Sequence, residues 1–220
     1  MKQKLDSKKK KRTEQQKRWL LRQINDPYVA KAKKEGYRSR AAYKLIEIND
    51  KFKLFKPGQN ILDLGAAPGS WLQVVKQKVG KKGAITGVDL LPIEPIDDVN
   101  LIQDDFRSWC KTIIQKFDGV ISDMAPSSTG LMHVDQLKMA GLIEDLLPYL
   151  SDLLVPEGFF IFKTFQGGLN NEIQKNLKQM FKTVKHFKPK ASRSDSRETY
   201  VICLSFTVSQ LTQHQNITLN

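Results

Sequence analysis

Four ionisable side chains in four separate segments are of types that can move a proton. They are Lys44 in SRAAYKL, Asp123 in ISDMAPS, Lys163 in FIFKTFQGG and Glu198 in SRETYV. Gathered in one place, such groups can aim a hydroxyl and take its proton. Three of the four also have an ordinary structural explanation. Lys44 would pair with Glu47 one helical turn on. Lys163 would extend its ammonium to water past an apolar stem, and Glu198 would be a surface acid.

A glycine turn lies between two of these segments. The stretch NILDLGAAPGSW, from Asn60 to Trp71, reads as a buried strand that passes into a tight turn and then a helix. Glycine has no Cβ, so backbone N–H groups at such a turn can approach a ligand closely. A second apolar run ends on Asp89, whose carboxylate can accept two hydrogen bonds from a ribose diol. The order strand, turn, helix, strand, acid predicts a nucleoside-binding unit, although the glycines alone also fit any strand-to-helix loop.

The chemistry of this turn distinguishes between nucleosides. A dehydrogenase would also show a glycine turn and an acid on the next strand. Here the turn reads GAAPG instead of GxGxxG, so it lacks the second glycine that lets backbone approach a pyrophosphate. Asp63, just before the turn, would repel a phosphate and attract a cation. S-adenosylmethionine, which carries an ammonium and a sulfonium and no phosphate, fits this turn better.

Six motifs in one order carry a family resemblance. DLGAAPGSW, VDLLP, DDF, SDMAP, FKTFQG and SRETY, between about Arg38 and Phe206, together resemble the FtsJ/RrmJ (RlmE) family of ribosomal RNA ribose 2′-O-methyltransferases. The resemblance implies an α/β, Rossmann-like class I S-adenosylmethionine-dependent fold, with a seven-stranded, mostly parallel sheet and helices on both faces. It also implies methylation of a uridine in large-subunit (23S) ribosomal RNA, late in ribosome assembly.

The resemblance also assigns site residues by motif. The catalytic set falls on Lys44, Asp123, Lys163 and Glu198, and the methyl-donor contacts fall on Gly69, Trp71, Asp89, Asp105 and Asp123. Ser70 stands where relatives often have a second glycine, and Asp104 beside Asp105 leaves open which carboxylate meets the adenine edge. The sequence also leaves open whether Lys163 removes the proton as a neutral amine or orients the hydroxyl as an ammonium. Because the sulfonium is an activated donor, no metal is expected.

Composition sets the outer bounds. At 220 residues the chain is long enough for one well-buried α/β domain. The only cysteines, Cys110 and Cys203, have no partner spacing for a disulfide scaffold or a zinc site. There is no run of 18 apolar residues and no secretory signal, so we expect a cytoplasmic protein that is not in a membrane. A monomer is the simplest expectation.

Positive charge is concentrated at the N-terminus. Residues 1–44 hold 16 Lys and Arg against 4 Asp and Glu, whereas the remainder holds 20 against 19. The run Lys8 to Arg12 is five consecutive cations, which fits a solvated tail. Between Lys17 and Arg40, cations alternate with apolar and aromatic residues, a mixture typical of an RNA-binding surface. We therefore divide the chain into a basic, partly disordered, RNA-contacting extension (1–37), a methyltransferase domain (38–208) and a polar tail (209–220). A nuclear signal or a mitochondrial presequence is the alternative for the extension.

Periodicity places these motifs on alternating strands and helices. Apolar spacing after Ser39 predicts an amphipathic helix with Ser39 as its N-cap, and Lys44 off its apolar face. Strands are predicted at 61–64, 100–103, 117–122, 158–164, 184–187 and 199–206, with a further apolar run within 83–92 that ends on Asp89, and helices near 107–115, 134–154 and 170–181. Such alternation predicts a doubly wound parallel sheet. No helix separates the last two strands, so we expect the antiparallel final pair that the family resemblance implies.

Other functions remain open on the sequence alone. A 2′-O-methyltransferase of a transfer RNA anticodon loop or an mRNA cap would share the four catalytic residues. A non-catalytic RNA-binding ribosome-assembly factor could keep the fold, and a dehydrogenase is the third alternative. The joint presence of the catalytic set and the donor turn argues against the non-catalytic factor, whereas the choice of large-subunit ribosomal RNA rests on the family resemblance.

Overall fold

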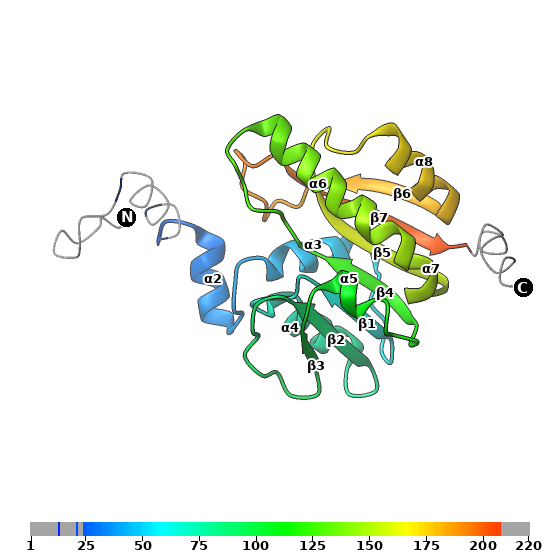
Figure 1. Ribbon diagram of the computed structural model, residues 1–220. Helices are drawn as coiled ribbons and strands as arrows, with labels where there is room; N and C mark the ends of the chain where they lie inside the picture. The colour runs from blue at the N-terminus through cyan, green and yellow to red at the C-terminus, as the bar shows by residue number, and fades with distance from the viewer. Residues whose placement is uncertain (1–12, 14–20, 22–23, 208–220) are drawn as a thin grey trace, which may run out of the picture.

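Seven strands form one sheet with helices on both faces (Figure 1). The computed structural model describes Thr13, Leu21 and residues 24–207. The strands are β1 Asn60–Leu64, β2 Ala84–Asp89, β3 Asn100–Gln103, β4 Phe117–Ser122, β5 Leu154–Phe165, β6 Phe181–Phe187 and β7 Glu198–Phe206. The helices are α2 Pro27–Glu35, α3 Ala42–Phe52, α4 Ser70–Val79, α5 Phe106–Trp109, α6 Met132–Leu146, α7 Leu150–Leu153 and α8 Asn171–Met180, with a 3₁₀ turn η1 at Leu147–Tyr149. The predicted α/β fold class is confirmed.

The sheet order fixes where a ligand can bind. The order is β3-β2-β1-β4-β5-β7-β6, and β1 to β5 run parallel. The chain moves outward from β1 to β3 and then returns to the other side of β1 with β4. The carboxyl ends of β1 and β4 therefore form a topological switch point, where open α/β sheets bind their ligands. β7 is antiparallel to both β5 and β6, which confirms the predicted final pair.

Alternation along the strands divides the core into two layers. Leu62, Val120 and Phe160 pack on the face covered by α5 to α8. Their neighbours Ile61 and Ile161 pack on the opposite face, with residues of α3 and α4. Because successive side chains of a strand alternate between faces, the catalytic side chains share the α3 side if they follow the same period.

Three predictions about the helices were wrong. Ala41 instead of Ser39 occupies the N-cap of α3, and the Ser39 hydroxyl accepts the Ala41 amide at 3.2 Å and lies 2.8 Å from the hydroxyl of Ser70. The helix predicted at 107–115 is only the four residues of α5; a turn follows it, and Ile114 is 97% exposed. The helix predicted at 134–154 starts at Met132 and is interrupted at η1. Pro148 lies in this turn and has no N–H to continue the helix.

The helix α2 precedes the sheet and packs on α3. Asp26 caps it by accepting a hydrogen bond from the Tyr28 amide at 3.0 Å, and Gly36 ends it with φ of 77°. The rings of Tyr28 and Tyr43 lie 5.5 Å apart, which fixes α2 against α3. The predicted Lys8 to Arg12 run and the tail 209–220 lie outside the described residues. Within the described part of the chain, no helix is long and apolar enough to cross a membrane.

Candidate active site

The four residues of the predicted catalytic set meet at one place. Lys44 Nζ lies 2.8 Å from Glu198 Oε2 and 3.8 Å from Asp123 Oδ2. Lys163 Nζ lies 3.1 Å from Asp123 Oδ1 and also donates to the Asp123 carbonyl. The ion pairs form a chain in the order Glu198, Lys44, Asp123, Lys163. Residues up to 154 positions apart in sequence are therefore joined in a single ionic network, which we call the tetrad.

Strand geometry explains why these side chains converge. Lys163 follows Ile161 at a spacing of two on β5, so it points to the α3 side of the sheet. Its partner across the ladder to β7 is Tyr200, and Glu198 lies two residues before Tyr200 on the same face. Asp123 directly follows β4, and α3 supplies Lys44 from above this face. The Lys44–Glu47 pair considered above does not form, since Glu47 accepts the backbone N–H of Ala191 instead.

Burial and neighbouring charges have opposite effects on the pKa of Asp123, the central carboxylate of the tetrad. Burial opposes ionisation of Asp123, but Lys163 and Lys44 outweigh it and hold the pKa of Asp123 below its usual value. The Tyr200 hydroxyl adds to this effect by donating to Asp123 Oδ1 at 2.7 Å. Burial and the carboxylates of Asp123 and Glu198 raise the pKa of Tyr200 well above its ordinary value, so its hydroxyl keeps its proton and remains a donor. Asp123 is therefore an anion held by two hydrogen-bond donors, Lys163 and Tyr200, and by the charge of Lys44.

Two polar residues of this site were not predicted. Tyr200 is fully buried and joins Asp123 to the aromatic core, and its ring lies 5.8 Å from that of Trp71. Ser192 donates to Glu198 Oε1 at 2.8 Å. The strand period was a usable signal for Tyr200, because it is two residues beyond Glu198 and so shares its face. Nothing in the sequence placed Ser192, which lies on the loop between β6 and β7.

The glycine turn after β1 lies beside the tetrad. Gly65 has φ of 75° and Gly69 has φ of 100°, a region that side chains with a Cβ rarely adopt. A Cβ on Gly65 would lie 2.1 Å from Met124 Cγ, next to Asp123. The turn and the loop after β4 therefore approach each other too closely for any residue but glycine at position 65. Gly69 is the N-cap of α4, whose amides open toward the switch point.

A buried acid without a partner lies at the base of this turn. Asp63 is 1% exposed, and neither of its carboxylate oxygens has a hydrogen-bond partner among the residues that the structure describes. Burial, together with the charges of Asp123 and Asp89, raises the pKa of Asp63 well above its usual value. An unpaired buried carboxyl is costly unless a ligand satisfies it. A cationic ligand in the turn would supply the missing charge and donors.

The remaining predicted donor contacts follow β2 and β3. Asp89 accepts the Ala67 amide with Oδ2 and the Leu91 amide with Oδ1, both at 2.8 Å. A carboxylate has about four lone-pair sites, so both oxygens can still accept hydroxyl donors. Asp105 caps α5 through the Arg107 amide at 2.8 Å. Their positions at the ends of neighbouring strands agree with a nucleoside laid across the carboxyl edge of the sheet.

Asp104 and Trp71 have their side chains engaged elsewhere. Asp104 Oδ1 accepts the Asp105 amide at 2.7 Å. The Trp71 indole is 2% exposed and donates to the Ala41 carbonyl at 2.9 Å. The indole therefore packs between the donor turn and α3, so the backbone of Trp71 is the part that faces the turn. The choice between Asp104 and Asp105 as the adenine contact stays a prediction.

The segment before α3 is bonded to the donor turn at three points. Arg38 Nη1 donates to the Pro68 carbonyl at 2.9 Å, and its guanidinium also binds two carbonyls of the loop after β2. The hydroxyls of Ser39 and Ser70 lie 2.8 Å apart, and the Trp71 indole binds Ala41. This segment, residues 38–41, leads directly into the helix turn that carries Lys44. We refer to these contacts as the 38–41 staple.

The residues at the switch point fit S-adenosylmethionine. The unpaired Asp63 suits its ammonium, and Asp89 suits its ribose diol. The tetrad lies next to this turn and would face the methyl group. Among the residues that the structure describes, no group of histidines, cysteines and acids could hold a metal ion.

Comparisons with known proteins agree with this site. A model of the FtsJ-like methyltransferase family matches residues 37–206. A ribosomal RNA large subunit methyltransferase E of Rhodopseudomonas palustris (strain BisA53) is 46% identical over 207 residues, covering 90% of this chain and 88% of the relative. The protein of the same name from Rickettsia felis is 47% identical, covering 89% of this chain and 91% of the relative. A crystal structure of a ribosomal RNA methyltransferase from Plasmodium falciparum is 33% identical, with a TM-score of 0.69 over 77% of this chain and 98% of that one. With its fold, donor turn and tetrad in agreement, the chain belongs to the FtsJ-like methyltransferase family.

Proposed function

We propose that the protein transfers a methyl group from S-adenosylmethionine to the ribose 2′-hydroxyl of a uridine in large-subunit (23S) ribosomal RNA, in the cytoplasm. The single observation that carries this proposal is the tetrad, assembled at the carboxyl edge of a methyltransferase sheet. The choice of RNA rests on the names of the relatives and on the basic N-terminal segment, which holds most of the net charge of +13. Cations interleaved with aromatic residues suit a phosphate-rich, partly unstacked partner.

The reaction needs a hydroxyl that is aimed and then loses its proton. When bound, S-adenosylmethionine supplies an activated methyl group on sulfur. The 2′-oxygen forms a bond to the methyl carbon as the carbon–sulfur bond breaks, and S-adenosylhomocysteine leaves with the electron pair. As the new bond forms, the hydroxyl proton becomes strongly acidic, so a weakly basic carboxylate is sufficient to accept it.

The structure supports a division of labour within the tetrad. Lys163 makes two contacts to oxygens of Asp123, a geometry in which the lysine is the donor. In our proposal, the Lys163 ammonium holds the 2′-oxygen in line and Asp123 receives the proton. Lys44 pairs with Asp123 on its other side, and Glu198 in turn pairs with Lys44. Positioning of the two reactants then supplies most of the rate enhancement.

Loss of the Lys163 amine tests this function. Labelled methyl transfer to unmodified large ribosomal subunits, free ribosomal RNA and bulk transfer RNA would be measured with wild type and Lys163→Ala, and the labelled nucleotide mapped. We expect label on a uridine 2′-oxygen of the large-subunit RNA, and a rate at least ~100-fold lower in the variant with donor affinity retained. Label on transfer RNA would overturn the substrate, and no label on any RNA would overturn the reaction. Equal rates for both proteins would refute the role of Lys163.

A further inference from the structure

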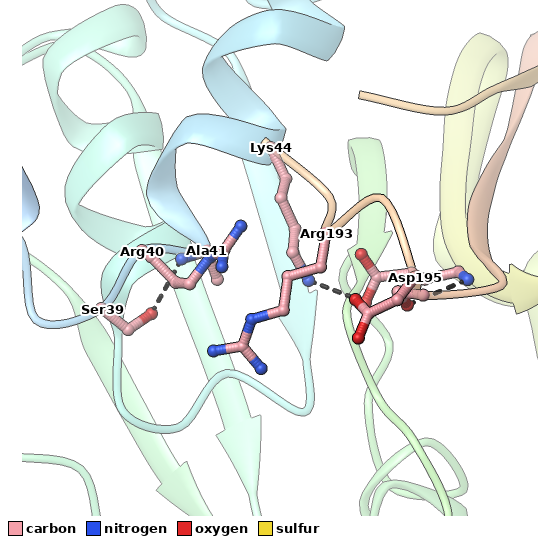
Figure 2. A pocket seen from close by; sticks show the side chains of 8 residues that line it. Ser39, Arg40, Ala41, Lys44, Arg193 and Asp195 are labelled. Carbon is pink, nitrogen blue, oxygen red and sulfur yellow. Dashed lines mark hydrogen bonds and ion pairs between the residues drawn. The ribbon is translucent and has the colours of Figure 1, made fainter. Parts of the chain in front are cut away.

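Two arginines lie beside the tetrad without a role in the chemistry above. A cavity of about 420 Å³ is lined by Lys44 and Glu198 of the tetrad and also by Arg40 and Arg193. Figure 2 shows the Arg193 side chain reaching into the space that Arg40 and Lys44 also border. A second cavity, of about 850 Å³, is lined by the same two arginines. Arg40 and Arg193 therefore lie at the junction of the catalytic cavity and a wider groove.

The lining of these two cavities has an excess of positive charge. Its cations are Arg40, Lys44, Lys188, Lys190 and Arg193, and its carboxylates are Asp26, Asp195 and Glu198. Glu198 is already paired with Lys44, and Asp26 is shared by the two arginines. With five cations against three acids, the junction favours an anionic ligand.

Asp26 holds the two guanidinium groups in place. It is 8% exposed, accepts from Arg40 Nη1 and lies 3.4 Å from Arg193 Nε. Arg40 Nη2 donates to the Ala191 carbonyl, so Arg40 also fastens the loop between β6 and β7. Among the described residues, the two terminal nitrogens of Arg193 have no hydrogen-bond partner. One carboxylate thus orients two guanidiniums but neutralises only one, and Arg193 keeps a fork of donors pointing into the cavity.

The chemistry of the substrate requires an anion close to the tetrad. In RNA, the carbon next to the one that bears the 2′-hydroxyl bears the 3′-phosphodiester. A ribose placed against Lys163 therefore brings a phosphate close to the site, and a guanidinium fork matches phosphate oxygens well. We propose that Arg193, supported by Arg40 and oriented by Asp26, binds the RNA phosphate that adjoins the methylated ribose. This proposal rests on the proposed function, since it assumes an RNA substrate.

The test separates phosphate binding from catalysis. Wild type, Arg193→Ala, Arg193→Lys and Lys175→Ala would be compared in binding to unmodified large-subunit ribosomal RNA, with S-adenosylhomocysteine present so that no methyl transfer occurs. Lys175 on α8 is an exposed lysine, so its removal is a matched loss of one charge. Affinity would be measured across a series of salt concentrations, together with donor affinity, the midpoint of thermal unfolding and labelled methyl transfer.

The expected result is specific to Arg193. Arg193→Ala should weaken RNA binding about tenfold and reduce the slope of log affinity against log salt by about one, with donor affinity and unfolding midpoint unchanged. Arg193→Lys should recover the salt slope but only part of the affinity, because it restores charge without the fork. An unchanged affinity and slope in Arg193→Ala, or an equal loss in Lys175→Ala, would overturn the phosphate site. Absence of methyl transfer by wild type would instead count against the proposed function, which the binding series does not measure.

Discussion

Asp123 is the member of the tetrad that pairs with both of its lysines. It receives hydrogen bonds from Lys163 and Tyr200 and an ion pair from Lys44, and its pKa is lowered against the effect of burial. A group whose pKa is lowered by folding contributes stability above its unfolded pKa, and this contribution is lost as pH falls through the folded pKa. The same interactions that keep Asp123 ionised for the reaction therefore also stabilise the fold at neutral pH.

For Asp63, the pH dependence of stability has the opposite sign. Its pKa is raised by folding, so the folded protein binds more protons than the unfolded chain between the two pKa values, and stability falls as pH rises through that range. Asp63→Asn removes the cost of ionisation. Without donor, we expect the variant to gain more stability at pH 8 than at pH 5, by about 1.4 kcal/mol for each unit by which the folded pKa exceeds 5. Thermal unfolding at the two pH values measures this difference.

The same substitution, Asp63→Asn, should weaken the binding of the methyl donor. Asn lacks the charge that would pair with the ammonium of S-adenosylmethionine, so the Kd from calorimetric titration should rise at least about tenfold. Asp152→Asn, at an exposed position of α7, is the control and should change neither property. An equal stability gain at both pH values would show that Asp63 is an ordinary carboxylate in the folded protein.

Among the secondary-structure elements, two glycines make a matched pair for a second prediction. Gly65→Ala forces a side chain into φ of 75° and places its Cβ 2.1 Å from Met124 Cγ, so the donor turn must open. We expect a lower unfolding midpoint and at least a tenfold loss of donor affinity. Gly141→Ala, within α6, meets nothing within 4 Å and should stabilise by about 0.5–1 kcal/mol. That gain would raise the midpoint by about 2 °C, with methyl transfer unchanged. A destabilised Gly141→Ala, or an unaffected donor site in Gly65→Ala, would contradict this reading of the two glycines.

The elements differ in how far the sequence determined them. The strands 100–103 and 117–122 were predicted with their observed bounds. Each is a short apolar run between turn residues, and such a run fixes where a strand can begin and end. The 107–115 helix failed because local spacing does not reveal whether a partner covers Ile114. The tetrad was found because each of its residues lies in a motif of the family that the sequence resembles, although the four lie on a helix, two strands and a loop. The Asp26–Arg193 pair was not found, since it joins segments 167 residues apart. Ser192 was not found either, because no motif marks the loop between β6 and β7 that carries it.

Across the whole molecule, positive charge is concentrated in the N-terminal residues. Residues 1–12 contain seven Lys and Arg and one Asp. If they contact RNA phosphates, their deletion should raise the KM for ribosomal RNA and make its dependence on salt shallower, because fewer counterions are released on binding. The kcat and the affinity for S-adenosylmethionine should not change. Methyl-transfer kinetics at several salt concentrations measure both effects, and an unaltered salt dependence would show that this segment does not contact the RNA.

The 38–41 staple has a thermodynamic consequence for the two substrates. One end of the staple is the donor turn, and the other leads into Arg40 and Lys44 at the acceptor cavity. A ligand that changes the geometry of the donor turn therefore also changes the geometry of the acceptor cavity, because hydrogen bonds join the two. In a closed binding cycle this effect is reciprocal. If the methyl donor changes the affinity for RNA by some factor, RNA changes the affinity for the donor by the same factor. S-adenosylhomocysteine, the spent donor, lacks the sulfonium charge. Its formation can therefore lower the affinity for the methylated RNA.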